Sequence, residues 1–307
     1  MVGKIINNIK LLFQLKTEVR HLRNDVEVLR LLNGKMFANL NKGKVADGLA
    51  DVEFKVFSQY GDDGIINYLT SNLDITNKVF VEFGVENYTE SNTRFLLMND
   101  NWRGLVMDGS DQNVRYIKSD IITRRFDIKS KAVFVTAENI NDVIKEHGIE
   151  GEIGLLSVDI DGNDYWVWKA INVVNPVIVV SEFNSVWGPD KPYTIPYDPS
   201  FYRTDYHYSN LCYGSSLLSL CDLAEEKGYA FVGCNTMGNN AYFVRKNKLG
   251  NLLKPLTASE GYVRSNFSES RNETGHWTYL KGSDRIKKMN GVKVYNTRTK
   301  ALETINE

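Results

Sequence analysis

Acidic side chains stand at the carboxyl ends of four apolar, strand-like segments of the sequence. The four acids are Glu82 in 78–84, Asp108 in 104–108, Asp159 in 153–159 and Glu182 in 177–182. In an open sheet of parallel strands, ligands bind in the crevice outside those ends. Each acid alone could be a helix cap, but four in corresponding places are harder to explain that way. We therefore predict a ligand crevice lined by carboxylates.

The turn after the first of these segments indicates which ligand the crevice takes. It reads Gly84-Val85-Glu86-Asn87-Tyr88-Thr89-Glu90, with a single glycine and two acids. A dinucleotide phosphate needs a glycine-rich turn without nearby negative charge, so an NAD-linked enzyme is disfavoured. A ligand with a ribose, a positive centre and no phosphate fits better, and S-adenosylmethionine has these properties. Asp108 is placed to accept hydrogen bonds from ribose hydroxyls.

Acids after the fourth and fifth segments predict a reaction site beside that ligand. Asp159 and Asp161 lie in the segment 159–164, and Glu182 begins the segment 182–184. Their oxygens could remove a proton from an acceptor hydroxyl, or hold a divalent cation such as Mg²⁺ that lowers the hydroxyl's pKa. The alternative is that Asp159 borders the cofactor and that Asp161 and Asp164 cap loops. We predict Asp159, Asp161 and Glu182 as catalytic residues, with metal ligands undetermined.

The segment 185–213 is long, rich in proline and aromatic residues, and follows the fifth strand-like segment. Its aromatic residues include Tyr193, Tyr197, Phe201, Tyr202, Tyr206 and Tyr208. Such a loop is typical of a lid that stacks on sugar rings and excludes water. His207 is the candidate base if no metal serves, although a lone histidine is more often structural. We expect Arg203 and Tyr206 to contact the acceptor, and Arg203 could pair with a diphosphate.

The alternation of apolar segments with helix-like segments predicts the scaffold for these residues. The expected strands are 78–84, 104–108, 133–136, 153–159 and 177–182. Near-continuous apolar strands separated by helices imply a parallel sheet covered on both faces. We therefore predict a doubly wound α/β fold of the Rossmann-like kind.

Several motifs follow one another along this scaffold. They are Val81-Glu82-Phe83-Gly84 with Ser91-Asn92-Thr93, then Trp102-Arg103-Gly104-Leu105-Val106-Met107-Asp108, and then 155–162. They resemble motifs of class I S-adenosylmethionine-dependent methyltransferases, particularly the FkbM-like group that includes bacterial surface-polysaccharide sugar O-methyltransferases. The resemblance spans about residues 55–246. It implies a methyltransferase domain over 55–250 that ends in a helix and a reversed hairpin, with strands at 230–232 and 240–245.

The resemblance also implies a set of cofactor contacts. They are Glu82, Gly84, Asn92 and Thr93 along the cofactor, Asp108 at ribose, Ala137, Glu138 and Asn139 at adenine, and Gln59 and Tyr60 at the methionine end. Asn139 is an equally good helix cap before Ile140. The first motif lacks the usual GxGxG, so this sequence departs from the common pattern there.

The N-terminal segment 1–33 predicts a helix with a heptad seam. Its apolar positions are Leu12, Val19 and Val26 at a, and Leu15, Leu22 and Leu29 at d. Glu18 and Asp25 then fall at g, opposite Arg23 and Arg30 at e of a parallel partner. We predict a homodimeric coiled coil over 12–32, followed by a linker over 34–54. A helix docked on its own domain is the alternative, and a weak membrane-surface contact is a lesser one.

Composition narrows the class of protein. The chain has 307 residues, of which 42% are hydrophobic and 24% charged, typical of a folded globular protein without a transmembrane segment. Its net charge of −1 gives no field to attract nucleic acid. Three cysteines do not make a disulfide framework, so we expect a reducing cytoplasm.

These observations together predict an O-methyltransferase that uses S-adenosylmethionine and acts on a sugar or nucleotide-linked sugar hydroxyl for a surface polysaccharide. Other small hydroxylated acceptors, such as macrolides, are the alternative within the same enzyme class. A non-catalytic coiled-coil interaction protein with a ligand-binding Rossmann-like domain is the alternative outside it. The C-terminal extension 251–307 could complete the acceptor pocket or merely pack on the sheet.

Overall fold

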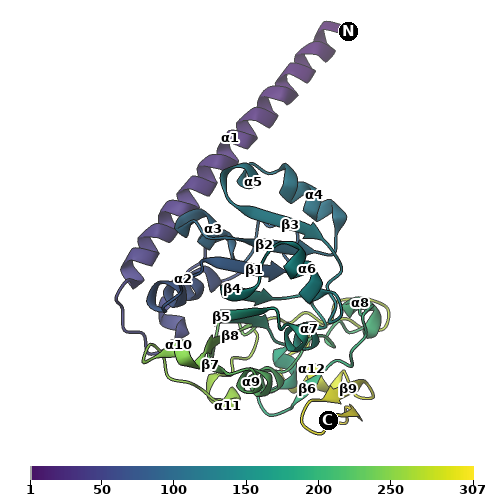
Figure 1. The fold of residues 1–307 in the computed structure, drawn as a ribbon. Helices are drawn as coiled ribbons and strands as arrows, with labels where there is room; N and C mark the ends of the chain where they lie inside the picture. Colours follow the sequence, from purple (N-terminus) through teal and green to yellow (C-terminus); the bar gives the residue numbers. More distant parts are fainter. Residues whose placement is uncertain (1) are drawn as a thin grey trace.

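The computed structural model describes the backbone of residues 2–307 and the side chains of residue 4 and residues 7–307. A seven-stranded sheet with the order β3-β2-β1-β4-β5-β8-β7 forms its centre (Figure 1). The strands are β1 (Val79–Phe83), β2 (Arg103–Asp108), β3 (Ile128–Ala132), β4 (Gly151–Val158), β5 (Val174–Glu182), β7 (Tyr229–Cys234) and β8 (Asn240–Arg245). Strands β1 to β5 are parallel, and β8 lies antiparallel to both of its neighbours. This confirms the predicted doubly wound sheet with a reversed hairpin.

Helices cover both faces of the sheet, which explains why its strands read as near-continuous apolar runs. One face packs against α2 (Asp62–Asn72), α3 (Arg94–Asp100), α4 (Asp111–Ser119) and α5 (Ile122–Arg125), and the other against α6 (Ile140–Glu146), α7 (Asp164–Ala170) and α9 (Leu217–Glu226). In β1, Val79, Val81 and Phe83 point to the second face and Phe80 to the first. The core is therefore two apolar layers separated by the sheet.

The third strand is displaced from its predicted place. We expected it at 133–136, whereas β3 spans Ile128–Ala132 and pairs with β2 from Gly104 to Asp108. It is an edge strand, and its residues after Ile128 are partly exposed, so lysines at 129 and 131 are tolerated there. The apolar run that suggested a strand instead leaves the sheet towards the next helix.

The segment 185–213 and the C-terminal extension form one structural unit. A short helix η2 (Ser185–Trp187) is followed by β6 (Tyr193–Thr194), which pairs with β9 (Lys293–Asn296), and β9 pairs with β10 (Ala301–Thr304). Helices α8 (Arg203–Tyr206) and α12 (Ser283–Lys287) belong to the same unit. A small core joins the two segments through Trp187, Leu211, Met289, Val294 and Ile305. We call residues 185–213 and 262–307 the lid unit.

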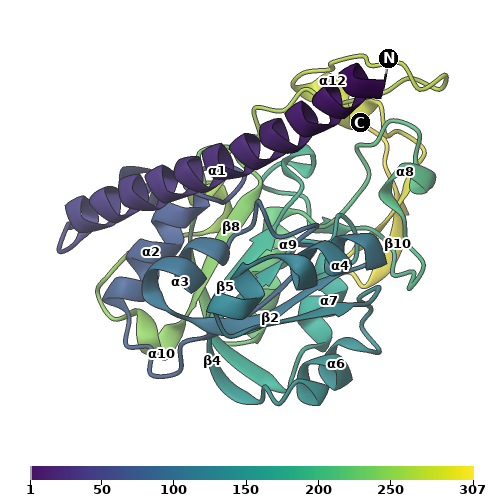
Figure 2. The ribbon, with the colours of Figure 1, turned by 90° about the horizontal axis from the view of Figure 1, so that it is seen from above.

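Helix α1 (Val2–Asn41) is longer than predicted and ends near Asn41 instead of at residue 33. Asn33 and Gly34 look like a stop signal, but Gly34 serves close packing, because a Cβ there would lie 2.6 Å from Val56 Cγ2. The connection to the domain is correspondingly shorter than 34–54 and contains the helix η1 (Leu49–Val52). Figure 1 shows the N-terminal part of α1 extending past the sheet and its helices, and Figure 2 shows the helix running along one side of the domain past α2 and α3. Within the described residues, none of the helices has the length and apolar character needed to span a membrane.

Two short helices complete the domain behind the hairpin. They are α10 (Lys246–Leu249), directly after β8, and α11 (Ala258–Gly261), which packs against α9 and β7. A hydrogen bond between Thr257 Oγ1 and the amide of Glu260 starts α11. The chain then crosses to the carboxyl ends of the strands and enters the lid unit.

Candidate functional site

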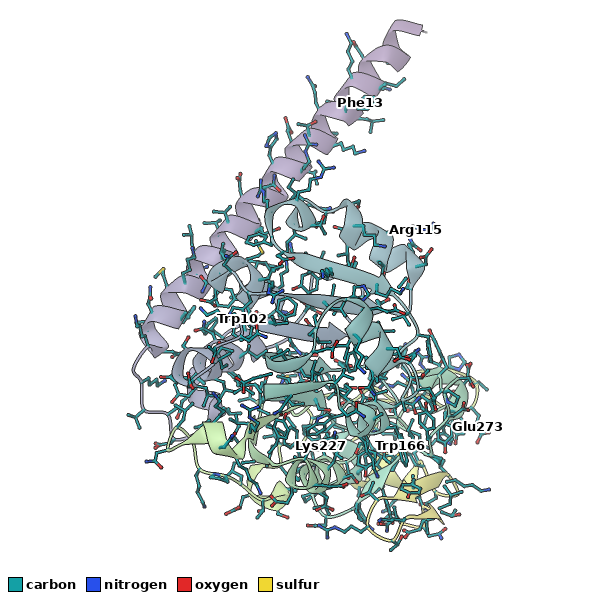
Figure 3. The ribbon with its side chains drawn as sticks, in the orientation of Figure 1. Phe13, Trp102, Arg115, Trp166, Lys227 and Glu273 are labelled. Carbon is teal, nitrogen blue, oxygen red and sulfur yellow. The ribbon has the colours of Figure 1, made fainter. Side chains whose placement is uncertain are left out.

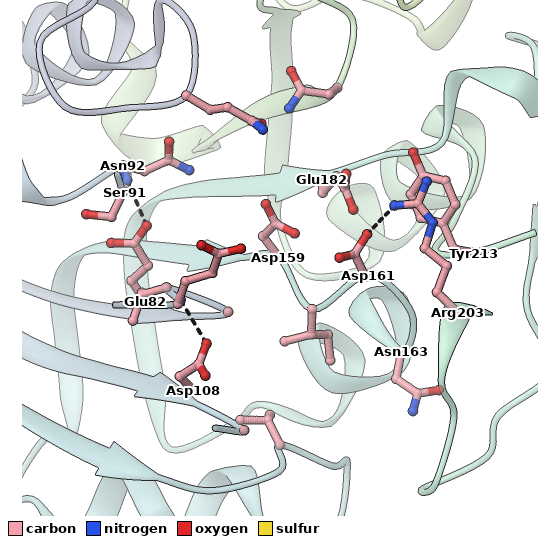
Figure 4. Close-up of a pocket in the computed structure, with 18 of the residues that line it drawn as sticks. Glu82, Ser91, Asn92, Asp108, Asp159, Asp161, Asn163, Glu182, Arg203 and Tyr213 are labelled. Atoms are coloured by element: carbon pink, nitrogen blue, oxygen red, sulfur yellow. Dashed lines mark hydrogen bonds and ion pairs between the residues drawn. The ribbon is translucent and has the colours of Figure 1, made fainter. Parts of the chain in front are cut away.

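A cavity of about 800 Å³ lies at the carboxyl ends of β1, β2, β4 and β5, between the sheet and the lid unit (Figure 4). This volume is in the range of small-molecule sites. Eight carboxylates line it, namely Glu82, Glu86, Glu90, Asp108, Asp159, Asp161, Glu182 and Glu269. The lining cations are two arginines, Arg203 and Arg285. The predicted crevice therefore exists, and it is strongly acidic.

Asp108, the last residue of β2, lines the part of the cavity that we call the cofactor half. Its carboxylate accepts hydrogen bonds from the amides of Glu86 and Ser110, both at 2.8 Å, and from Asn113 Nδ2 at 3.0 Å. Gly84 begins the turn above it with a φ of +79°, and a Cβ there would lie 1.5 Å from the carbonyl oxygen of Asp159. The turn is thus fixed from two sides, by Asp108 and by its close approach to the end of β4.

Glu82 points from β1 towards the same half and holds the start of α3. Its carboxylate accepts the amide hydrogens of Asn92 at 2.8 Å and Thr93 at 3.1 Å, and also a bond from Thr93 Oγ1. Burial raises the pKa of Glu82 to about 7, although these hydrogen bonds act to lower it. Asn92 lines the cavity and donates to Ser157 Oγ at 3.1 Å, whereas Thr93 is buried behind it. Gln59 and Tyr60 line the cavity as well.

Ala137, Glu138 and Asn139 were predicted to contact adenine, but none of the three lines the cavity. The cavity is lined there by Val133, Phe134 and Val135 instead. The amide of Val133 donates a hydrogen bond to the carbonyl of Asp108 at 2.9 Å. Asn139 caps the turn before α6, accepting from Thr136 N at 2.9 Å, and Glu138 accepts from Tyr197 Oη. The prediction is displaced because β3 ends earlier than expected, so that the chain passes the cavity earlier.

Asp159 and Glu182 form the floor of the other part of the cavity, which we call the acceptor half. Asp159 follows β4, Glu182 ends β5, and the two side chains lie next to one another (Figure 4). Within the described residues neither carboxylate accepts a hydrogen bond, and Glu182 Oε2 is fully buried without a partner. Burial raises the pKa of both groups well above the ordinary range. Repulsion by Asp161 raises the pKa of Asp159 further, and repulsion by Asp159 does the same for Glu182. Two adjacent carboxyl groups in this state can exchange a proton with a ligand.

Asp161 lines the same half, close enough to this pair for its charge to act on both groups. It adopts a φ of +54° and forms an ion pair with Arg203 Nη1 at 2.5 Å. The Arg203 guanidinium also donates to the carbonyl of Asn210 and stacks on Tyr213, 3.6 Å from the ring centre. In the described part of the chain, no group of three or more acids, histidines or cysteines is arranged to hold a metal ion. The residues present therefore do not form the Mg²⁺ site that we had considered.

His207 and Tyr206, predicted as a base and as an acceptor contact, do not line the cavity. The Nδ1 atom of His207 lies 2.7 Å from Ser209 Oγ, and its ring packs on Tyr208. Tyr206 donates its hydroxyl to the carbonyl of Lys293 at 2.7 Å, inside the lid unit. Short helix α8 directs Arg203 inwards, while the residues that follow it face the small sheet. Of the aromatic residues predicted for the lid, only Phe201 and Tyr202 line the cavity.

Several lining residues were missed by the sequence analysis. Arg285 in α12 is 9% exposed and donates to the carbonyls of Phe267 at 2.9 Å and Glu269 at 3.4 Å. Phe267 packs against Tyr60 with ring centres 5.4 Å apart, and Tyr213 supports Arg203. No local motif marks these residues, because they reach the cavity through the pairing of β6 with β9.

No protein-family model matches the chain, and no curated protein matches it in sequence. The structure is similar to a S-adenosylmethionine-dependent methyltransferase from Clostridium acetobutylicum, with 10% identity and a TM-score of 0.40, over 60% of this chain and 89% of that one. It is similar to the N-terminal domain of EvdMO1 in the presence of SAH and D-fucose, with 11% identity and a TM-score of 0.39, over 68% and 94% of the chains. PKMT2 from Rickettsia typhi in complex with AdoHcy has 11% identity and a TM-score of 0.37, over 56% and 49%. Likeness at this level does not identify a ligand or a reaction for this chain.

Proposed function

We propose that this chain is an S-adenosylmethionine-dependent O-methyltransferase that acts on a hydroxyl of a sugar or nucleotide-linked sugar destined for a surface polysaccharide. The observation that carries the proposal is the contrast between two halves of one cavity. The cofactor half is acidic and lacks a phosphate cradle, and the acceptor half contains two adjacent carboxylates without hydrogen-bond partners. The halves meet where the turn at Gly84 touches Asp159.

The cofactor half suits a nucleoside with a positive centre. Asp108 is placed at the end of β2 to accept a further bond from a ribose hydroxyl, and Phe134, 47% exposed, offers a flat apolar surface beside it. Glu86 and Glu90 repel phosphate and complement a positive charge. When bound, S-adenosylmethionine supplies a methyl group on a positively charged sulfur.

The acceptor half suits removal of a hydroxyl proton. Methyl transfer is an in-line displacement, so the protein must align the acceptor oxygen and take its proton. Either Asp159 or Glu182 can accept that proton, because both carboxylates lie in the cavity without competing hydrogen bonds. Arg203, held by Asp161 and stacked on Tyr213, borders the pair and limits the repulsion between them.

The lining favours a sugar over a macrolide. Carboxylates, amides and aromatic rings dominate the acceptor half, with Tyr202 and Phe267 as flat surfaces on which a sugar ring can stack. A macrolide would need a larger apolar wall than these residues provide. A nucleotide-linked sugar would direct its diphosphate towards Arg203 and Arg285, the arginines that line this half.

Two further expectations from the sequence stay proposals. We propose that the chain works as a homodimer joined by its N-terminal helix, whose apolar seam is exposed along the described residues. We also propose the cytoplasm as its location, since its three cysteines are free thiols and two of them are buried.

The test is a turnover assay with methyl-labelled S-adenosylmethionine and a panel of acceptors. Nucleotide-linked sugars, the corresponding free glycosides and a macrolide are incubated separately, and mass spectrometry detects a gain of one methyl group. We expect methylation of sugar substrates by the full chain, and a rate lower by roughly 10²-fold or more in the Asp159→Asn variant. Calorimetry with S-adenosylhomocysteine and with NAD separates the alternatives. Binding of S-adenosylhomocysteine without turnover of any acceptor favours a non-catalytic binding protein, and binding of NAD instead refutes the proposal.

A further inference from the structure

Helix α1 presents one face to its own domain. Glu27, Leu31, Gly34 and Ala38 follow one another at spacings of four, three and four residues, so they share one side of the helix. Glu27 forms an ion pair with the buried Arg94 at 3.3 Å. Leu31 and Ala38 pack against a cluster of Phe54, Val56, Phe57 and Phe95, and Gly34 touches Val56 and Phe95. The C-terminal half of α1 is therefore a rigid part of the domain.

The opposite face of α1 is an exposed apolar seam. Its exposed fractions are 65% for Leu12, 47% for Leu15, 49% for Val19, 64% for Leu22, 43% for Val26, 59% for Leu29, 64% for Met36 and 71% for Leu40. These residues occupy the a and d positions of a heptad repeat. The docked residues occupy b and f, together with Phe37 at e, which stacks on Phe54 but stays 51% exposed. Because b and f lie across the helix from a and d, docking on the domain leaves the seam open. Figure 3 shows the N-terminal part of the helix, with Phe13, extending clear of the domain.

The length of the helix brings one polar residue into this seam. A helix ending at residue 33 would have stopped before Met36 and Leu40, but α1 continues to Asn41 and makes Asn33 an internal a position. A single asparagine at a, surrounded by apolar a and d residues, is satisfied when it faces the same asparagine of a parallel, in-register partner. Asn33 is exposed in the isolated chain. The position is therefore suited to pairing with a second copy.

The charges beside the seam favour the same partner. In a parallel dimer, Glu18 at g lies opposite Arg23 at the following e of the other helix, and Asp25 opposite Arg30. An antiparallel arrangement does not create these g-to-e pairs. A membrane surface would favour basic residues along both flanks of an apolar stripe, whereas Glu18 and Asp25 flank this one.

We propose that a second copy of this chain covers the seam as a parallel, in-register two-stranded coil over residues 12–40, with Asn33 fixing orientation and register. The coil is about four heptads long, and its C-terminal half is already ordered by the domain, so dimerisation does not have to fold that half. The docked face remains on the outer side of each helix. This inference does not depend on the reaction proposed for the cavity.

The first experiment measures the mass of the full chain by light scattering at several concentrations. We expect a dimer, and Leu22→Glu and Leu29→Glu in the seam should weaken dimerisation at least tenfold. Val28→Glu is the matched control, because Val28 is 56% exposed but lies at c, outside the seam. A monomeric full chain overturns the proposal. Circular dichroism and thermal unfolding establish that the seam variants remain folded.

The second experiment tests orientation and register. A Val26→Cys chain should form a disulfide-linked dimer under mild oxidation, since parallel in-register a positions face each other, and a Val28→Cys chain should cross-link far less. Asn33→Leu should reduce cross-linking at position 26 or change the oligomer mass. Equal cross-linking at positions 26 and 28 overturns the parallel register. Co-sedimentation of a monomeric chain with vesicles of phosphatidylcholine and phosphatidylserine would replace the second copy with a membrane surface.

Discussion

The two halves of the cavity use the same residue type at the same place in the fold, with opposite results. Glu82 and Asp108 in the cofactor half each accept three hydrogen bonds from nearby groups of the chain. Asp159 and Glu182 in the acceptor half accept none within the described residues. The first pair holds turns and a helix start in place, and the second pair is left for a ligand.

The two pairs also have opposite effects on the stability of the folded chain. A buried carboxylate without hydrogen bonds destabilises the folded chain, whereas one that accepts amide hydrogens stabilises the turn that supplies them. The acceptor half therefore carries a cost in stability that only a bound ligand can offset. We expect substitutions in the two pairs to change the free energy of unfolding in opposite directions, and the following predictions use that difference.

The largest effect should come from neutralising the unbonded pair. Asp159→Asn and Glu182→Gln should each lower the methyl-transfer rate by roughly 10²- to 10⁴-fold, the usual contribution of a positioned acid or base. Affinity for S-adenosylhomocysteine should change little, because these residues lie outside the cofactor half. Single-turnover rates and calorimetry measure the two quantities. Full activity in both variants would remove the pair from the reaction.

The same variants should become more stable, in a pH-dependent way. The raised pKa of each group means that the folded chain holds its proton more tightly than the unfolded chain does. The resulting stabilisation is complete below the unfolded pKa of about 4 and is lost as pH rises through the raised pKa. The midpoint temperature of thermal unfolding should therefore fall more steeply with rising pH in the wild-type chain than in Asp159→Asn. An equal slope in both chains contradicts the assignment.

The pH dependence of activity should respond to Asp161. A carboxylate base must be ionised, so activity should fall on acidification, with a midpoint well above that of an ordinary carboxyl group. Asp161 raises the pKa of Asp159, and its loss also leaves the Arg203 charge unpaired. Asp161→Asn should accordingly shift this acidic limb to lower pH. A shift to higher pH would indicate that Asp159 is not the titrating base.

Substitution of the hydrogen-bonded pair, Glu82 and Asp108, should cause smaller losses, in cofactor affinity and in stability. Asp108→Ala should weaken binding of S-adenosylhomocysteine by about 1 to 3 kcal/mol, because a ribose hydroxyl and two loop amides lose their acceptor. Glu82→Gln should lower the free energy of unfolding by a similar amount, since its amide nitrogen cannot accept from the start of α3. Glu86→Gln is the control for loss of charge alone. Stabilisation by Glu82→Gln would erase the distinction between the two pairs.

The smallest effect is expected outside the cavity. His207→Ala should leave the methyl-transfer rate and its pH profile within about twofold, because the ring contacts Ser209 and Tyr208 and does not line the cavity. Steady-state kinetics measures this variant beside Asp159→Asn. A large loss of rate would mean that the lid unit closes to bring His207 to the acceptor.

The sequence by itself determined the sheet and the acids at its edge. Apolar segments around Phe83, Val106, Leu156 and Val179 can only be buried on both faces, which forces parallel strands covered by helices and places the following acids together. The heptad seam was also visible, because its spacing is local. The edge strand β3 and the end of α1 were misplaced, since an exposed strand needs few apolar residues and Gly34 looks the same in a stop signal and in close packing.

Only the tertiary structure decided which acids are bonded and which are free. Asp108 and Asp159 are equivalent in sequence context, but amides from the neighbouring turns reach one and not the other. The pairing of β6 with β9 brings Arg285 to the cavity, and the direction of α8 admits Arg203 while excluding His207. These outcomes depend on contacts between residues far apart in the chain. A local pattern records a residue's type and spacing, whereas its hydrogen-bond partners are set by the packing of distant segments.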